Sequence, residues 1–418
     1  MVSKVLVVGT TPDYAKWIKT LLKGEGFFIT DLELRKHAVE PKLEPIEEVL
    51  CDLADYNNAV CFLKEHVKRY DIDVAGVACF DCESMELASI ISKELNVKFQ
   101  DLSTIHNCRD KFISKAHWKQ KSLFTPDIAR IETFKQAESF FKNLKGKGCV
   151  LKPSSGAGSE LVFLCHDLKE LKLAYEKASK GLKEKNGNRL YDSPTVKRSL
   201  VLEEYISGTE YSCDFIIQDD DVKIIRLTEK LKFPGQIFGI IDGYKLINSI
   251  PDISEEVLHN TLFRAASSVG LNNTICMLDF IVKDNNIFLI EIAPRPGGDC
   301  LPELLETATG QNILAMNIDL ARGKMLQLQD YKTIKSWVAL RIFAKKRGAL
   351  SEIDTKELLK NSMVAKVNIT SYKGKKIELP PKDYDSWILG NIILKPKAAD
   401  NTYSIAKKII SLVCIKIE

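Results

Sequence analysis

The chain has 418 residues, a length typical of two to four domains. Its 45% hydrophobic and 28% charged residues are those of an ordinary globular protein, and its formal net charge is only +4. Lysine and arginine are spread along the chain, which gives no electrostatic case for nucleic-acid binding. The first apolar run is too short for a signal peptide, and no run reaches the roughly 18 residues of a membrane span. We therefore expect a cytoplasmic protein that binds neither nucleic acid nor membrane.

The eleven cysteines are odd in number, scattered and mostly inside apolar runs, which indicates reduced core thiols. Cys79 and Cys82 form one CxxC pair. A structural zinc site needs a second pair of ligands, and none is evident in the sequence. We interpret these two cysteines as ordinary thiols, with redox work as the alternative.

Strands and helices alternate over the first part of the chain. Residues 4–8 (KVLVV) predict a buried strand, and TTPDYAKWIKTLLKGEG predicts a helix with a glycine stop. FFITDLEL predicts the next strand, and helix, strand and helix follow at DYNNAVCFLKEHVKRYDI, VAGVACF and ESMELASIISKELNV. This pattern predicts a doubly wound parallel sheet over residues 1 to about 100. The turn GTTPDY lacks the glycines of a dinucleotide-binding turn, so we do not expect NAD.

Hairpins dominate the middle of the chain, after helical segments between 111 and 145 that break at FTPDI. CVLKP and ELVFLC flank a loop, and further strands are predicted at SLVLEEYI, EYSCDFIIQ, VKIIRLTEK, ICMLDFIVK and IFLIEIAP. Residues 329–418 mix short strands and helices and end with the helix TYSIAKKIISL and a strand. The predicted fold class is α/β and α+β, with a parallel sheet domain, a two-part module of antiparallel sheets and a mixed C-terminal domain.

One predicted hairpin, CMLDFIVKDNNIFLIEIAP, brings two acids together. A three-residue loop over 284–286 pairs Lys283 with Ile287 and Asp279 with Glu291, and leaves the other face apolar. A two-residue turn would put one acid on each face, so we prefer the three-residue loop. Opposed carboxylates, with Cβ atoms roughly 4.5–5.5 Å apart, need a shared proton or a cation such as Mg²⁺. The plain alternative is two surface acids on a solvated strand face.

The same counting on CDFIIQDDDVKIIRLTEK places Asp214 opposite Arg226 and Glu210 opposite Lys230. Both are opposite-charge pairs, and a ladder of ion pairs explains them well. Glu210 also has a competing role in nucleotide binding, given below.

A loop rich in glycine and serine follows Lys152 in VLKPSSGAGSELVFLC. Gly156 and Gly158 allow positive φ and close backbone approach, so successive N–H groups can converge on an anion. The hydroxyl donors are Ser154, Ser155 and Ser159. The loop is neither a P-loop nor a dinucleotide turn, because its lysine precedes it and no third glycine follows. It is either a lid over phosphates or a flexible surface hairpin.

Five motifs in order resemble the ATP-grasp superfamily, and within it the carboxylate–amine ligases, which include L-amino-acid ligases. They are CRDKFISKAHWK, KPSSGAGS, LEEYISGTEYS, LDF and IEIAPRPGGD. The resemblance covers most of the chain. It implies a sheet domain over 1–110, a nucleotide-binding module over 111–328 with a lid at about 122–205, and a C-terminal domain over 329–418.

The resemblance implies an ATP site. The phosphates would meet Lys111 and Lys152 and would be covered by Ser155, Gly156, Ala157, Gly158 and Ser159. The adenine would meet Glu203 and the backbone of Glu204, Tyr205 and Ile206, and the ribose hydroxyls would meet Glu210.

The resemblance also implies a reaction centre. Asp279 and Glu291 would bind Mg²⁺, or Mn²⁺ in its place, and Arg295 would stabilise an acyl-phosphate. The substrate pocket would be shaped by Gly297, Gly298 and Asp299. Many members carry Asn as a third metal ligand where this chain has Ala293. Water or a more distant acid such as Glu229 could complete the metal shell.

These residues predict an ATP-dependent ligase that joins a carboxylate to an amine, with amino acids as the expected substrates. The alternatives are an ATP-grasp enzyme acting on bicarbonate or formate, and a non-catalytic nucleotide-binding module, which Ala293 favours. The resemblance alone suggests a homodimer.

Overall fold

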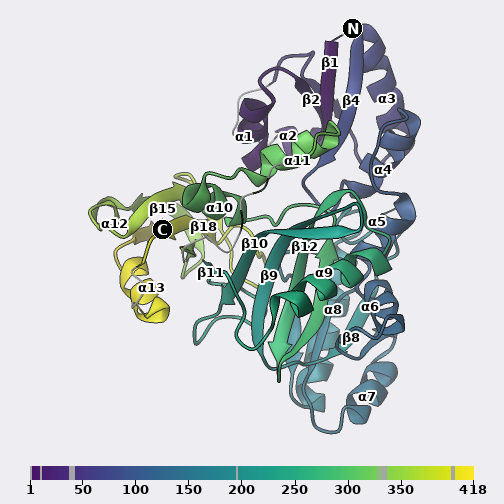
Figure 1. The fold of residues 1–418 in the computed structure, drawn as a ribbon. Coiled ribbons are helices and arrows are strands. Elements are labelled where there is room, and N and C mark those ends of the chain that lie inside the picture. Colours follow the sequence, from purple (N-terminus) through teal and green to yellow (C-terminus); the bar gives the residue numbers. More distant parts are fainter. Residues whose placement is uncertain are drawn as a thin grey trace.

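The alternation of strands and helices at the N-terminus builds a four-stranded parallel sheet of order β3-β2-β1-β4. The structure is a computed structural model that describes residues 2–9, 12–36, 43–193, 196–326, 328, 330, 337–396 and 401–418. This sheet and its helices form the lobe at the top of Figure 1. Its elements are β1 (Val2–Val8), α1 (Pro12–Leu22), β2 (Gly26–Asp31), α2 (Leu32–Lys36), β3 (Glu48–Cys51), α3 (Tyr56–Arg69), β4 (Ile72–Cys79) and α4 (Met85–Glu94).

The predicted strand FFITDLEL is correct only in its first half. The strand ends at Asp31, and the next five residues form α2. The Asp31 carboxylate accepts the backbone N–H groups of Glu33 at 3.0 Å and Leu34 at 3.2 Å. An aspartate that satisfies these first N–H groups acts as a helix cap, and this stops the strand.

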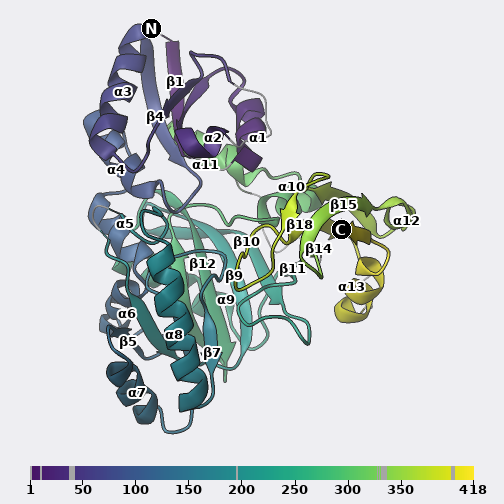
Figure 2. The same cartoon turned by 180° about the vertical axis from the view of Figure 1, so that it is seen from behind.

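A second, antiparallel sheet of order β5-β8-β6-β7 forms the lower lobe, covered by two helices (Figures 1 and 2). Two further helices connect it to the N-terminal lobe. The elements are α5 (Leu102–Arg109), α6 (Lys111–Gln120), β5 (Ile128–Ile131), α7 (Phe134–Asn143), β6 (Cys149–Pro153), β7 (Phe163–Cys165), α8 (Leu168–Glu184) and β8 (Leu200–Glu204). CVLKP and ELVFLC pair as the predicted hairpin, with Cys149 opposite Cys165.

The central element is an eight-stranded sheet of order β13-β12-β9-β10-β11-β14-β18-β16. This sheet contains strands from both sides of the predicted domain boundary at residue 328. The boundaries at residues 110 and 328 both stay predictions. The elements are β9 (Thr209–Gln218), β10 (Asp221–Leu231), β11 (Gly243–Leu246), α9 (Glu255–Ser268), β12 (Thr274–Lys283), β13 (Asn286–Ala293), α10 (Leu301–Thr309), α11 (Ile313–Ala321), β14 (Val338–Phe343), β16 (Val364–Ile369) and β18 (Ile388–Leu394).

A small sheet of order β17-β15-β19 completes the C-terminal lobe. It carries the predicted final helix and terminal strand. The elements are β15 (Gly348–Asp354), α12 (Lys356–Leu359), β17 (Lys376–Ile377), α13 (Thr402–Ile410) and β19 (Cys414–Ile417). Among the described helices, none combines the length and the apolar composition that a bilayer crossing requires.

Helix α11 returns from the central sheet to the N-terminal lobe and packs against β4 and α1 (Figures 1 and 2). Gly76 on β4 makes this contact close, because a Cβ there would lie 1.9 Å from the carbonyl oxygen of Ala321. Glycine is therefore required for the approach of the two backbones.

Two hairpins of the central sheet differ from prediction in their turns. Each turns through two residues with positive φ, 219–220 and 284–285, and not through three. Two-residue turns of this kind match the twist of antiparallel strands. An extra residue then bulges in each second strand, Ile225 in β10 and Ile290 in β13. The three-residue loops were thus wrong, because the counting assumed strands without bulges.

The bulges restore the pairing that the longer loops would have given. Asp279 lies opposite Glu291, and Asp214 lies opposite Arg226. Both predicted pairs are therefore confirmed, although the physical reason is a turn plus a bulge in each hairpin.

All eleven cysteines lie in the described part of the chain and are free thiols. Most are buried, as predicted, but Cys414, which the sequence placed in an apolar run, is exposed.

Candidate active site

A cavity of about 610 Å³ opens between the β5-β8-β6-β7 sheet, the central sheet and the N-terminal lobe. Every predicted site residue lines it. These residues are Lys111, Lys152, Ser155, Gly156, Ala157, Gly158, Ser159, Glu203, Glu204, Tyr205, Ile206, Glu210, Asp279, Glu291, Arg295, Gly297, Gly298 and Asp299. The structure therefore brings together segments that are far apart in the sequence.

The carboxylates of Asp279 and Glu291 lie on adjacent strands, and each is held by a lysine. Lys111 lies 3.2 Å from Glu291, and Lys230 forms a short ion pair with Asp279. Burial alone would raise both pKa values, but Lys111 and two further lysines lower the pKa of Glu291 to about 2. Burial and the charge of Glu291 raise the pKa of Asp279 even though Lys230 opposes this. The two pKa values thus move apart, as expected for two carboxylates close to each other.

One oxygen of this pair has no partner of its own. Asp279 Oδ2 contacts Lys230, whereas Oδ1 is buried and finds no hydrogen-bond partner among the described residues. A buried carboxylate oxygen without a donor is costly. Because two carboxylates are a common protein contribution to a Mg²⁺ site, Asp279 and Glu291 fit such an ion.

Neither Ala293, where the sequence lacks the usual third ligand, nor Glu229, the predicted replacement, adds a ligand to the pair. Ala293 pairs with Met277 one step along the hairpin and offers no donor side chain. Glu229 precedes Lys230 on β10, and alternation along a strand directs it to the opposite face. In the described part of the chain, no group of three or more His, Cys, Asp or Glu residues is placed to hold a metal.

The carboxylate of Glu203 forms ion pairs with two lysines. Its carboxylate lies 2.8 Å from Lys152 and 3.1 Å from Lys115, and all three side chains are buried. Burial lowers the pKa of Lys115 to about 8, because the negative charge of Glu203 does not fully compensate for the removal of the ammonium group from water. The predicted contact of Glu203 with an adenine amino group stays a prediction, since its carboxylate here binds ammonium groups.

Glu210 is also held by lysines, which favours the ion-pair ladder predicted for it. Lys230 lies 2.8 Å from one oxygen, and Lys232 forms a short contact with the other. These lysines outweigh burial and lower the pKa of Glu210 to about 2. Its role toward ribose hydroxyls stays a prediction.

The serines of the glycine loop anchor the loop to its surroundings. Ser155 Oγ donates to the carbonyl of Leu190 at 3.2 Å, and Ser159 Oγ donates to the carbonyl of Gly239 at 2.8 Å. Ser154 Oγ accepts from Ser199 Oγ at 2.9 Å. The hydroxyl groups of Ser155 and Ser159 therefore already donate to the protein, and the backbone N–H groups are better candidates than these two hydroxyls for an anion.

The predicted adenine segment follows β8 at the edge of the cavity. The N–H groups of Glu204 and Tyr205 donate at 2.8 Å to the carbonyls of Asp127 and Gly148. The Tyr205 ring packs edge-on against Phe238, with 6.0 Å between ring centroids. These contacts fix the strand end against the lid.

The buried pair of Asp214 and Arg226 holds the loop at Gly297 in place. Asp214 Oδ2 accepts from Arg226 Nε at 2.7 Å, and Oδ1 accepts from the N–H of Gly297 at 2.8 Å. A Cβ on Gly297 would lie 2.9 Å from Leu301 and 3.0 Å from Arg226. The sequence predicted the pair but not its function as an anchor for Gly297.

Two arginines, Arg295 and Arg341, line the cavity near Asp299. Arg295 donates through Nε and Nη2 to the sulfur of Cys82, at 3.2 and 3.1 Å. Arg341 on β14 donates through Nε to Asp299 at 2.6 Å. Cys82 therefore belongs to the cavity wall, whereas Cys79 is buried and contacts Asp81.

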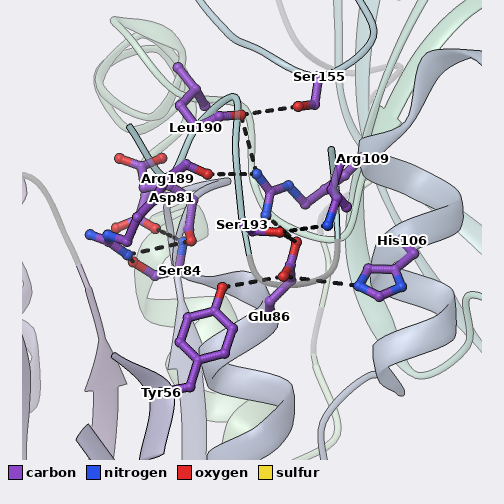
Figure 3. A network of polar contacts seen from close by, with 12 residues as sticks. Tyr56, Asp81, Ser84, Glu86, His106, Arg109, Ser155, Arg189, Leu190 and Ser193 are labelled. Atoms are coloured by element: carbon purple, nitrogen blue, oxygen red, sulfur yellow. Dashed lines mark hydrogen bonds and ion pairs between the residues drawn. The ribbon is translucent and has the colours of Figure 1, made fainter. Parts of the chain in front are cut away.

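A polar network joins the N-terminal lobe to the glycine loop (Figure 3). At its centre, the buried Glu86 forms a short ion pair with Arg109 and accepts from Tyr56 at 3.2 Å. Arg109 donates to the carbonyl of Leu190 at 3.2 Å, and Ser155 donates to the same oxygen. The loop around Leu190 thus connects the network to the predicted phosphate site.

Sequence reasoning missed the roles of five charged residues of this region: Lys115, Lys230 as a partner of Asp279, Arg341, and Arg109 with Glu86. Lys115 follows Lys111 by one helical turn, which is the spacing of residues on one helix face. That spacing was the only local signal. The other contacts depend on which strands and lobes become neighbours.

Residues 146–303 match the family model described as the ATP-grasp domain. The chain is 24% identical over 282 residues to the uncharacterized protein y4rH of Sinorhizobium fredii, a match that covers 68% of this chain and 56% of that protein. It is 25% identical over 163 residues to dapdiamide A synthase of Enterobacter agglomerans, covering 39% and 36%. The matches thus span about half or less of these relatives.

The fold is similar to that of L-amino acid ligase from Bacillus licheniformis. The TM-score is 0.78, with 19% sequence identity and 99% of both chains covered. At this identity the likeness concerns the fold.

Proposed function

We propose that this chain, whose ATP-grasp domain spans residues 146–303, is an ATP-dependent ligase that joins a carboxylate to an amine. One observation carries the proposal. The opposed acids Asp279 and Glu291 share a single cavity with Lys111, Lys152 and the glycine loop. Phosphoryl transfer needs charge neutralisation and in-line positioning, and this combination supplies both.

In the first step, a substrate carboxylate oxygen attacks the γ-phosphorus of ATP. The bond to the bridging oxygen breaks, ADP leaves, and an acyl-phosphate remains. Lys111 and Lys152 would contact the phosphates, and Asp279 and Glu291 would hold Mg²⁺, which supplies positive charge to the transferred group. The backbone N–H groups of the glycine loop would cover the phosphates.

In the second step, the amine nitrogen attacks the acyl carbon, phosphate leaves with the bonding electrons, and the nitrogen gives up one proton, which the departing phosphate can accept. Arg295 would stabilise the negative charge on the acyl-phosphate. Gly297, Gly298 and Asp299 would shape the wall of the substrate pocket. Water must be kept out, because it would hydrolyse the acyl-phosphate.

Amino acids are the proposed substrates. The similarity in fold to an L-amino acid ligase and the sequence match to dapdiamide A synthase support this class. The two arginines of the cavity, Arg295 and Arg341, suit carboxylate or phosphate groups, because a guanidinium binds either through paired N–H groups.

The test is an ADP-release screen over pairs of amino acids, with mass spectrometry of the products. An amide product with stoichiometric ADP supports the proposal, and ADP release with bicarbonate or formate alone contradicts it. Glu291→Gln is expected to abolish turnover. Near-normal ADP release by that variant at saturating Mg²⁺ would refute the metal assignment.

Nucleotide binding is tested separately with Lys152→Ala. Loss of a charge-assisted contact of about 1.5–3 kcal/mol should weaken ATP binding roughly tenfold to a hundredfold. Lys142→Ala is the matched control, because Lys142 pairs with Glu138 on the exposed face of α7. Equal ATP affinity of the two variants would favour the alternative that the glycine loop is a flexible surface hairpin without a role in ATP binding.

A further inference from the structure

The ammonium group of Lys230 occupies a specific place beside the proposed metal site. Lys230 extends from β10 across β9 and reaches Asp279 on β12, so its side chain spans two strand spacings of the central sheet. On the way it contacts Glu210 at 2.8 Å. Only 9% of the Lys230 side chain is exposed.

The two oxygens of Asp279 have different surroundings. Oδ2 is bound by Lys230, and the buried Oδ1 has no hydrogen-bond partner within the described ranges. The second acid, Glu291, contacts Lys111 through Oε2. One oxygen of each acid is therefore engaged by an ammonium group, which leaves one side of the pair for a cation.

The residue that would serve a second cation is missing. Ala293 follows Glu291 on the same face of β13 and carries no donor atom. No third His, Cys, Asp or Glu among the described residues joins the pair in a group able to hold a metal. A second ion near Asp279 Oδ2 would also compete with Lys230 for the same oxygen.

We propose that Lys230 acts as a built-in cation on Asp279, so that the carboxylate pair holds a single divalent ion. This inference rests on the proposed nucleotide-dependent function. Lys230 supplies at this acid the positive charge that a second ion would otherwise bring. A lysine has a fixed charge and needs no free metal, and the buried contact with Glu210 holds it in place.

The experiment counts Mn²⁺ ions bound per ADP by equilibrium dialysis and records their electron paramagnetic resonance. Two Mn²⁺ ions in one site lie roughly 3.5–4 Å apart and give a spin-coupled spectrum, whereas one ion gives an uncoupled spectrum. We expect one uncoupled Mn²⁺ in the wild type and in Ala293→Asn. We expect two coupled ions in the double variant Lys230→Met with Ala293→Asn.

Two controls separate charge from folding. Lys230→Arg keeps the positive charge and should bind one Mn²⁺, and Lys232→Met removes a neighbouring lysine that contacts Glu210. It should also bind one. Two ions in the wild type or in Ala293→Asn would overturn the inference, as would one ion in the folded double variant. The wild-type count remains decisive if the double variant does not fold.

The count is independent of catalysis. If one Mn²⁺ binds but no amide product forms, the ligase proposal is refuted and the proposed role of Lys230 stands. If an amide product forms but two Mn²⁺ ions bind, the ligase proposal stands and the proposed role of Lys230 is refuted.

Discussion

Asp214→Asn tests whether the buried ion pair holds the substrate loop in place. The Asp214 and Arg226 side chains are 1% and 0% exposed, and the carboxylate also accepts the N–H of Gly297 at 2.8 Å. Asparagine keeps the shape of the side chain but removes its charge. The substitution therefore leaves the guanidinium of Arg226 without its buried counter-charge.

The expected cost follows from these contacts. Breaking a buried ion pair by removing one partner destabilises a protein by about 3–5 kcal/mol. A hydrogen bond to a charged group contributes about 1.5–3 kcal/mol, and here that bond fixes Gly297. Asparagine has a single acceptor oxygen, which the Arg226 guanidinium should attract, so its NH₂ group would face the N–H of Gly297 in place of an acceptor. Since about 1.4 kcal/mol corresponds to a factor of ten, loss of the bond to Gly297 should lower kcat/KM at least tenfold.

The assay combines urea unfolding with steady-state ADP release. Asp214→Asn should lower both the unfolding midpoint and kcat/KM. The double variant Asp214→Leu with Arg226→Met removes the pair entirely, and such replacements are often neutral for stability. It should regain the midpoint but not kcat/KM, because Gly297 is still unanchored. A single variant within about 1 kcal/mol of the wild type, with unchanged kcat/KM, would refute the reasoning.

Three further predictions concern groups that the sequence did not identify. Because the pKa of Lys115 is lowered to about 8 from 10.5, the unfolded chain binds more protons between these values, and the free energy of unfolding should rise with pH there. Urea titrations of Lys115→Met should lack this rise. Glu86→Gln should leave the buried Arg109 side chain without a counter-charge and should raise the KM for ATP, because Arg109 also contacts the loop at Leu190. An unchanged KM would mean that Glu86 affects only the N-terminal lobe. Arg341→Lys should raise the KM of the acid or amine substrate but not that of ATP, because lysine cannot reproduce a bidentate guanidinium contact.

The two charged hairpins show how far the sequence could predict the site. Counting from an assumed three-residue loop gave the right partners for Asp279 and Asp214. The actual turns are shorter, and the bulges at Ile225 and Ile290 supply the missing residue. The burial of one apolar face and the pairing of charges were the real constraints. They are visible in the sequence, whereas a bulge has no local signature in these strands.

The cations of the site could not be predicted in the same way. Lys230 contacts an acid two strands away, and Arg341 contacts Asp299 from a strand that follows it by forty-two positions in the chain. Such contacts depend on the strand order β12-β9-β10-β11-β14, which a single sequence does not determine. Lys115 was accessible in principle, because it shares a helix face with Lys111.

The N-terminal lobe contributes one wall of the cavity, through residues such as Cys82 and Met85. Three connections join it to the rest: α11 packs on β4, Glu86 pairs with Arg109, and Cys82 accepts from Arg295. The predicted boundaries at 110 and 328 came from the resemblance, and the hydrophobic period of a segment indicates only which local structure the segment forms. It does not report where the apolar face of that segment is buried. Because α11 follows the segment that matches the ATP-grasp family model and packs on β4 of the first sheet, the lobe and the cavity are expected to depend on each other for stability.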